Sequence, residues 1–245
     1  MMDGWVNKKI HSILDPEIQF MDIQQLNDAA IKGWYDVTKI SAAAYPLVED
    51  EYDMLDSGAA MGFGAGPLLV ARPSFDRSQL KEARIALPGR HTTAHYLFNH
   101  FYPQAAKKEF MVFSEIEDAV SSGRADAGVI IHEGRFTYPE KGLMLLADLG
   151  VLWDQTYALP LPLGIMVCRK HFPDDIKTAI NDTIQASIQF AFDHPQSSEQ
   201  FVLENAREMS PEVVKQHIQL YVNEYSLSMG PAGIQAINFL ILKSK

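Results

Sequence analysis

One cysteine occurs among the 245 residues, and no stretch approaches the roughly 18 consecutive apolar residues needed to cross a bilayer. Cys168 lies in an apolar segment and has no intrachain partner for a disulfide, so a core position suits it better than a role as nucleophile. The first ten residues include Asp3, Lys8 and Lys9 and lack the apolar centre of a secretory signal. We therefore expect a cytoplasmic protein with no membrane contact.

Basic residues are also scarce. Lys and Arg total 21 against 31 Asp and Glu, which gives a formal net charge of −10. Because nucleic-acid phosphates are bound by a concentrated basic face, this balance disfavours a nucleic-acid partner. An anionic small-molecule substrate would have to be held by local groups such as helix N-termini.

Several signatures of cofactor and metal chemistry are missing as well. No Cys/His pairs have the spacing of zinc ligands, and no Gly-x-Ser-x-Gly turn marks a serine hydrolase. The glycines Gly62, Gly64 and Gly66 precede a strand-like segment instead of joining a strand to a helix, so they do not form a dinucleotide fingerprint and indicate flexible backbone near a hinge. The sequence predicts neither a metal nor a cofactor.

What the chain does contain is a nearly regular alternation of strand-like and helix-like segments. The predicted strands are Glu17–Met21, Trp34–Ile40, Pro67–Ala71, Arg84–Leu87, Phe110–Phe113, Ala127–Ile131, Met144–Leu146 and Leu163–Cys168. Capping-box spacings mark helix starts at Asp22 and Ser114, and residues 173–245 are helical by periodicity. The alternation predicts an α/β fold with mostly parallel sheets flanked by helices.

Two breaks in the pattern divide the chain into two lobes. Polar residues and Pro73 interrupt it at 72–79, and two prolines interrupt it within 159–170. We expect a discontinuous first lobe from residues 1–71 and 171–245, with a helical C-terminal tail, and a second lobe from residues 80–165. The hinge segments would lie at the two breaks.

Two predicted strand-to-helix junctions are suited to binding an anion. The first, Thr38–Ser41, brings Lys39 and the hydroxyl of Ser41 to a helix start, although Ser41 could equally be a simple N-cap and Lys39 a solvated edge residue. The second, Gly89–Ala94, places Thr92 and Thr93 at a helix start after a tight turn.

A third junction carries a histidine. His132 follows the apolar segment Ala127–Ile131 and precedes a polar turn, and in α/β proteins ligands bind at the C-terminal ends of strands. Strand-end placement alone favours an ordinary hydrogen-bonded histidine, and the balance shifts to catalysis only when the two anion-receptive helix starts are taken together with the ordered motifs described below. His91 and His95 could line the crevice, whereas solvated or capping roles are expected for His11, His171, His194 and His217.

Six collinear motifs resemble the 1,4-dihydroxy-6-naphthoate synthase family of the futalosine route to menaquinone. They run in order from residue 3 to about residue 170 and comprise Asp22–Asn27, Tyr35–Ser41, Ser57–Ala60 with Gly66–Ala71, Pro88–Ala94, Ile131–Tyr138 and Leu159–Gly164. The resemblance implies the two-lobed fold of type II periplasmic binding proteins, with each lobe a sheet flanked by helices. It also implies a lyase that converts cyclic dehypoxanthinyl futalosine to 1,4-dihydroxy-6-naphthoate and dihydroxyacetone without a cofactor.

The same resemblance assigns roles to single residues. His132 matches the family's proposed general base, and Asn27, Ser41, Thr93 and Ala94 match its ligand-contacting positions. Lys39 and Thr92 join this substrate-binding set because they flank Ser41 and Thr93 at the two helix starts. An imidazole that titrates near neutrality suits the removal of a proton from a carbon near a carbonyl.

One departure from the family lies at the N-terminus. Family members begin with a strand and a Ser-Pro-Cys-Pro-Asn-Asp-Thr-Phe turn ahead of the helix that Met2–Asn7 continues. We therefore expect a truncated or mis-started chain with weaker stability, a damaged site and an exposed sheet edge.

Two alternative functions stay open at this stage. The first is a solute-binding protein of the same fold, and the second is the related chorismate dehydratase. The His132–Phe136 segment and the Thr92–Ala94 loop favour the naphthoate synthase family over this dehydratase. Glu133 and Arg135 could orient His132 and the substrate, or pair with each other, the second being favoured for Arg135. Whether two copies form a homodimer is also left open.

Overall fold

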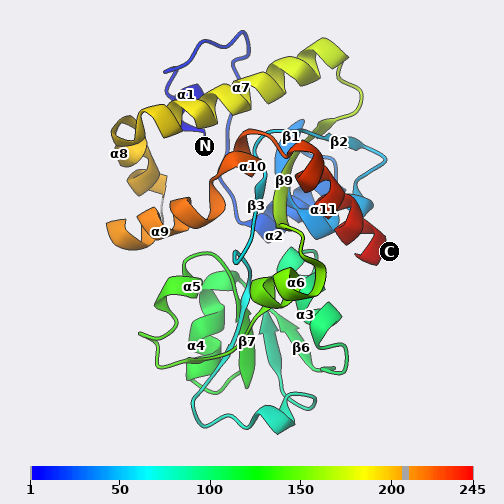
Figure 1. Cartoon of the computed structure of the whole chain (residues 1–245), viewed down its shortest axis with the longest axis vertical. Coiled ribbons are helices and arrows are strands. Elements are labelled where there is room, and N and C mark those ends of the chain that lie inside the picture. The colour runs from blue at the N-terminus through cyan, green and yellow to red at the C-terminus, as the bar shows by residue number, and fades with distance from the viewer. Residues whose placement is uncertain (1, 206–209, 245) are drawn as a thin grey trace.

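The computed structural model describes residues 2–205 and 210–244, and its strands form two separate sheets (Figure 1). In the first sheet, the long strand β9 (Leu161–Arg169) pairs antiparallel with each of three others. These are β1 (Val37–Ser41), β2 (Tyr52–Met54) and β3 (Ala60–Gly62).

The second sheet has the strand order β6-β5-β7-β4-β8. The strand β5 (Ile85–Leu87) pairs parallel with β6 (Lys108–Phe110) and β7 (Ala127–Ile130). In contrast, β4 (Leu68–Ala71) runs antiparallel to both β7 and β8 (Met144–Asp148). The predicted two-lobed α/β architecture is confirmed, but the expectation of mostly parallel sheets is wrong. It failed because β4 follows β3 of the other sheet and β9 follows α6 of the other lobe, so neither strand is joined to a partner in its own sheet by a crossover helix.

Helices surround both sheets (Figure 1). Those beside the second sheet are α3 (Thr93–Phe101), α4 (Ile116–Ser121), α5 (Gly134–Thr137) and α6 (Leu149–Tyr157), with the 3₁₀ helices η2 (Arg77–Gln79) and η3 (Phe113–Glu115). Those of the first lobe are α1 (Asp3–Val6), α2 (Ile23–Ile31), η1 (Ala42–Leu47), α7 (Asp174–Asp193), α8 (Pro195–Asn205), α9 (Pro211–Tyr221), α10 (Glu224–Leu227) and α11 (Gly230–Ser244).

The predicted helix starts had mixed outcomes. The capping box at Asp22 is present, because its carboxylate accepts from the N–H groups of Gln24 and Gln25 and the Gln25 side chain accepts from the Asp22 N–H. The box predicted at Ser114 does not form, since that residue lies inside η3 and α4 begins only at Ile116 without a side-chain cap. The segment Glu17–Met21 has no strand partner and is extended only as a connection into α2.

The lobe boundaries differ from the expectation at two segments. Leu68–Ala71, expected in the first lobe, form β4 between β7 and β8 of the second sheet, so the chain crosses between lobes before residue 68. Residues 72–79 instead contain η2 at the surface of the second lobe. Within residues 159–170, expected to contain a hinge, Leu161–Arg169 form the central strand of the first sheet, which includes the predicted strand Leu163–Cys168. The assignment of the other residues to the two lobes stays a prediction.

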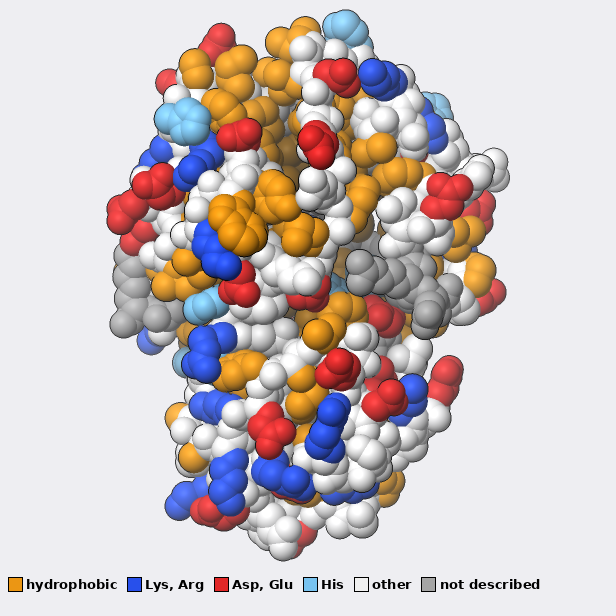
Figure 2. Space-filling model, turned by 180° about the vertical axis from the view of Figure 1, so that it is seen from behind, with side chains coloured by type: hydrophobic (Ala, Val, Ile, Leu, Met, Phe, Trp, Pro, Cys, Tyr) orange, Lys and Arg blue, Asp and Glu red, His pale blue; other side chains and the backbone are white. Residues whose placement is uncertain are grey.

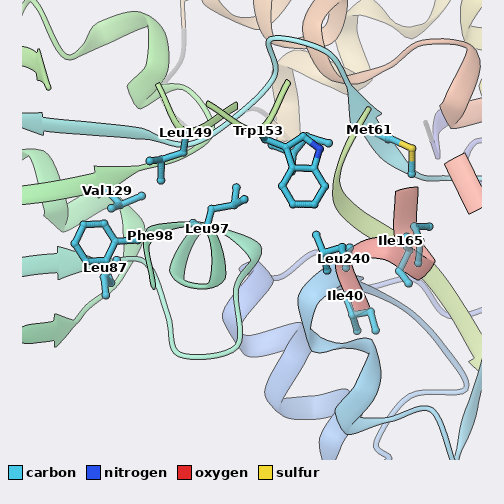
Figure 3. Packing of buried hydrophobic residues seen from close by; sticks show 14 of the residues in the cluster. Ile40, Met61, Leu87, Leu97, Phe98, Val129, Leu149, Trp153, Ile165 and Leu240 are labelled. Atoms are coloured by element: carbon cyan, nitrogen blue, oxygen red, sulfur yellow. The ribbon is translucent and has the colours of Figure 1, made fainter. Parts of the chain in front are cut away.

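A continuous apolar core joins the two lobes (Figure 3). Ile40, Ile165 and Leu240 from the first lobe belong to the same buried cluster as Leu87 and Val129 from the second, with α3 and α6 between them. Cys168 is buried in β9 of the first sheet, as expected of a core residue. The arrangement is therefore one in which the lobes are packed together.

The surface is mixed in charge. On the face shown in Figure 2, Lys and Arg side chains of the lower lobe are interspersed with Asp and Glu. Among residues 2–205 and 210–244, no helix has the length and apolar character needed to span a membrane.

Candidate active site

Asn27 on α2 holds the end of β1 against the loop that precedes α3. Its side chain is fully buried. The Nδ2 group donates to Ser41 Oγ at 3.0 Å and to the His91 carbonyl at 3.1 Å, while Oδ1 accepts from the Ser41 N–H at 2.8 Å. Both donor hydrogens of the amide are therefore used inside the protein, and Asn27 positions two of the predicted binding segments relative to each other.

Ser41 was expected either to cap a helix or to bind an anion. It precedes η1, but its hydroxyl makes no capping hydrogen bond to that helix. The hydroxyl instead accepts from Asn27, and Ser41 is only 2% exposed. The simple N-cap alternative is therefore wrong, and Ser41 is held by the Asn27 amide, which also reaches the loop before α3.

The N-terminus of α3 is built by two threonines with different tasks. Thr92 is the N-cap: its Oγ1 accepts from the His95 N–H and donates to the Gly89 carbonyl. Thr93 Oγ1 donates to the Leu163 carbonyl of β9 at 2.9 Å and so connects the lobes. Thr92 accepts a hydrogen bond from only one of the first N–H groups of α3. The remaining N–H groups of this first turn therefore point towards the space in front of the helix.

Gln24 adds a second connection at this loop. Its Oε1 accepts from the His91 N–H at 3.1 Å. Gly89 has φ +147°, and a Cβ at that position would stand 2.3 Å from Gln24 Oε1. The loop therefore needs glycine both for its backbone conformation and for the close approach of α2.

His132 lies where the sequence placed it, directly after β7 and before α5. Its backbone is left-handed, with φ +55°, and its ring is partly buried. The edge of Phe113 meets the ring with 5.0 Å between centroids, and His217 of α9 lies on another side at 6.0 Å. His132 is thus surrounded by residues from both lobes.

Lys39 of β1 completes a cluster of three basic groups with His132 and His217. Burial lowers the pKa of Lys39 to about 8. Burial and, second, the charge of Lys39 lower the pKa of His132 to about 4. The pKa of His217 is lowered to about 4 by burial first, then by His132 and Lys39. Both imidazoles are therefore neutral near pH 7, and a neutral imidazole can accept a proton.

The sequence interpretation missed His217. It was expected to be solvated, but it is partly buried beside His132. Val214, His217 and Tyr221 recur at helical spacing on one face of α9, and Val214 is buried. That spacing could have marked the face as buried, but only the folded chain shows that it meets His132.

Arg135 does not pair with Glu133, so that alternative is wrong. Its guanidinium donates to the carbonyls of Gly66 and Gly64 at 2.7 and 2.8 Å and forms a 2.6 Å ion pair with Asp148. These contacts fix the segment between β3 and β4, where the chain crosses from the first lobe to the second. This crossing had been expected to be flexible. Burial raises the pKa of the Glu133 carboxyl beside the His132 turn.

The other histidines have structural or exposed positions. His95 Nδ1 lies 2.7 Å from the Arg90 carbonyl, which assigns the ring proton to that nitrogen, and its Nε2 faces the Asn99 side chain. His11, His171 and His194 are exposed, as expected. In the part of the chain that the structure describes, no three His, Cys, Asp or Glu side chains are arranged to hold a metal ion.

The comparison with protein families decides the relationship. A family model described as menaquinone biosynthesis matches residues 10–243. The chain belongs to this family. A protein from Thermus thermophilus named 1,4-dihydroxy-6-naphthoate synthase is 37% identical over 240 residues, covering 98% of this chain and 87% of the relative. One from Streptomyces coelicolor with the same name is 38% identical over 233 residues, covering 93% and 82%. The resemblance deduced from the six motifs is confirmed.

Solved structures support the fold of this menaquinone-biosynthesis family member. A protein from Archaeoglobus fulgidus, 33% identical, superposes with a TM-score of 0.93 over 99% of this chain and 90% of its own. The ligand-binding component of an import system from Staphylococcus aureus, 17% identical, gives a TM-score of 0.65 over 92% and 79%. The alkanesulfonate-binding protein of Xanthomonas axonopodis, 15% identical, gives 0.61 over 83% and 72%. The fold is that of the type II periplasmic binding proteins, as expected.

Proposed function

We propose that the protein is a 1,4-dihydroxy-6-naphthoate synthase of the futalosine pathway, a carbon–carbon lyase. It cleaves cyclic dehypoxanthinyl futalosine into 1,4-dihydroxy-6-naphthoate and dihydroxyacetone, in the cytoplasm and without metal or cofactor. The names of the Thermus and Streptomyces relatives support this activity. The observation that carries it is the neutral His132 imidazole held at the junction of the lobes beside the cation of Lys39.

His132 acts as the general base in this proposal. Aromatising the naphthalene ring requires removal of a proton from carbon, and a neutral imidazole accepts it. A pKa of about 4 describes the site without substrate. An anionic substrate beside Lys39 brings a negative charge that raises the His132 pKa towards neutrality, where general-base catalysis is most effective.

The substrate's carboxylate is held by Lys39 and the first N–H groups of α3. Lys39 supplies a cation from the first lobe, and the helix start at Thr93 and Ala94 supplies N–H donors from the second. Asn27, Ser41 and Thr92 shape this wall through their hydrogen bonds.

Substrate entry requires the lobes to separate. Asn27, Ser41, Thr92, Thr93 and Ala94 are each no more than 3% exposed. The Thr93 bond to the Leu163 carbonyl and the Gln24 bond to the His91 N–H close the same junction. Closure around the substrate then excludes water from the reacting ring.

The test is turnover by the purified protein. The cyclic futalosine derivative is added, naphthoate is followed by absorbance, and dihydroxyacetone is measured separately. Replacing His132 by Gln should lower kcat by ~10²–10⁴-fold, the usual contribution of a positioned base. His171→Gln, a change at an exposed histidine, is the matched control and should leave kcat unchanged. Near-normal turnover by His132→Gln would refute the assignment of the base.

The fold leaves one specific alternative, a solute-binding protein, because the structural neighbours from Staphylococcus and Xanthomonas bind ligands. Calorimetric binding of the futalosine derivative with no product over hours would select that function. Conversion of chorismate in place of the futalosine derivative would select the related dehydratase.

A further inference from the structure

The C-terminal tail contributes a side chain to the candidate site. Ser210 caps α9, Pro211 begins it, and the buried Val214 anchors it. After the helix ends, Asn223 Nδ2 donates to the Met61 carbonyl at 2.8 Å, which fixes this end of α9 to β3. The helix therefore lies on the side of the first lobe that faces α5 (Figure 1). His217 reaches the His132 turn from this position.

We propose that His217 is a second proton-transfer residue of the site, working as a pair with His132. The two ring centroids lie 6.0 Å apart with the planes tilted by 43°. The proposal rests on the proposed lyase function and adds to it the residue that returns a proton to the leaving fragment.

The cleavage needs one proton removed and one delivered. His132 takes the proton from the substrate C–H bond, and that electron pair becomes part of the naphthalene ring as the C–C bond breaks. The electrons of the broken C–C bond stay on the three-carbon fragment, which gains a proton to become dihydroxyacetone. The proton passes from His132 to His217 through a water or substrate hydroxyl that bridges their ring nitrogens, and from His217 to the fragment, so both imidazoles end neutral and no oxidant or reductant is needed.

The surroundings restrict the pair to one proton at a time. Lys39 of β1 lowers the pKa of both imidazoles, and the charge of His132 lowers the pKa of His217 further. Tyr221, one turn along α9, packs against His217 with 4.6 Å between centroids, and burial raises its pKa to about 12, so its phenol stays neutral. The charges of Arg135 and Asp148 beyond Tyr221 act in opposite directions on this phenol. When one imidazole is charged, its neighbour is therefore a neutral acceptor.

The test compares His217→Asn with Gln216→Asn, an exposed neighbour on the same helix. We expect kcat to fall about 10- to 100-fold in His217→Asn, within the range for acid–base groups, with KM nearly unchanged and no loss in the control. In D₂O, the fraction of dihydroxyacetone that carries deuterium should change in His217→Asn and not in Gln216→Asn. The pH profile of kcat should lose one of its ionisations.

A second variant separates chemistry from folding. In His217→Ala, added imidazole should restore at least part of kcat, because the free base can occupy the vacated space, whereas it should not help His132→Gln. Wild-type kcat, pH profile and deuterium content in His217→Asn, with His132→Gln inactive, would overturn the role of His217 and leave the lyase intact. A slow His217→Ala that imidazole does not rescue would likewise assign a structural role. A wild-type protein that yields no naphthoate would overturn both proposals.

Discussion

The two imidazoles of the site should make the protein sensitive to mild acid. His132 and His217 each have a pKa lowered from 6.5 to about 4, with burial as the largest cause. The unfolded chain therefore binds protons on these residues below about pH 6.5, while the folded chain resists them until about pH 4. Because stability rises with pH wherever the unfolded state binds more protons, the stabilisation is complete above pH 6.5 and is lost as the pH falls to 4.

The size of the effect follows from the pKa difference. At pH 5, a shift from 6.5 to about 4 corresponds to a loss on the order of 2 kcal/mol per histidine relative to pH 7.5. Both histidines together lose about 4 kcal/mol, a large part of the ~5–15 kcal/mol that stabilises a typical domain. The charge of His132 also lowers the pKa of His217, so the single variant His132→Asn should recover more than half of the loss.

Urea unfolding at pH 7.5 and pH 5 measures this difference. The wild-type free energy of unfolding should drop by about 4 kcal/mol more than that of the double variant His132→Asn/His217→Asn, from the two shifts just described. His171→Asn, at an exposed position, should behave like the wild type. If the wild type and the double variant lose equal stability between the two pH values, the rings are not buried in neutral form and the reasoning fails.

Three further predictions test the surroundings of the site. Asn27→Ala removes three buried hydrogen bonds and should lower the free energy of unfolding by about 3 kcal/mol in urea, because unpaired backbone groups are left behind; a loss below 1 kcal/mol would contradict the clamp. Gly66→Ala places a Cβ 2.3 Å from the backbone of Gly150 and should cost at least ~2 kcal/mol by the same measurement, whereas an unchanged urea midpoint would show that the crossing yields. Lys39→Met removes a cation beside His132 and should raise the pKa of that imidazole in an NMR titration; a lower or equal pKa would exclude the charge of Lys39 as a cause.

Local patterns in the sequence located the parts of the site that depend on neighbouring residues. The strand Ala127–Ile130 and the turn at His132 are short, and their order along the chain sets where the imidazole goes. Thr92 was identifiable as an N-cap from its place before an apolar helix. The family resemblance then joined these local signals into one site.

Other parts of the site and of the fold depend on tertiary contacts that the sequence pattern does not reveal. His217 lies 85 positions after His132 in the chain, and nothing in the pattern of α9 says which surface its Val214 face covers. Arg135 was expected to pair within its own turn, yet it reaches Gly64, Gly66 and Asp148, because the crossing segment lies against α6. Strand direction failed for a similar reason, since β4 and β9 take their partners from distant parts of the chain.

The backbone of His132 supports the assignment of function independently of its neighbours. Lys8, His132 and Ala158 are the non-glycine residues with positive φ in the described ranges. Lys8 lies in an exposed turn and Ala158 ends α6, positions where a left-handed residue is ordinary. His132 instead follows a fully buried strand, and a left-handed conformation there costs about 1–3 kcal/mol that glycine would avoid. The general-base role proposed for His132 gives a reason for a partly buried histidine to retain this strain.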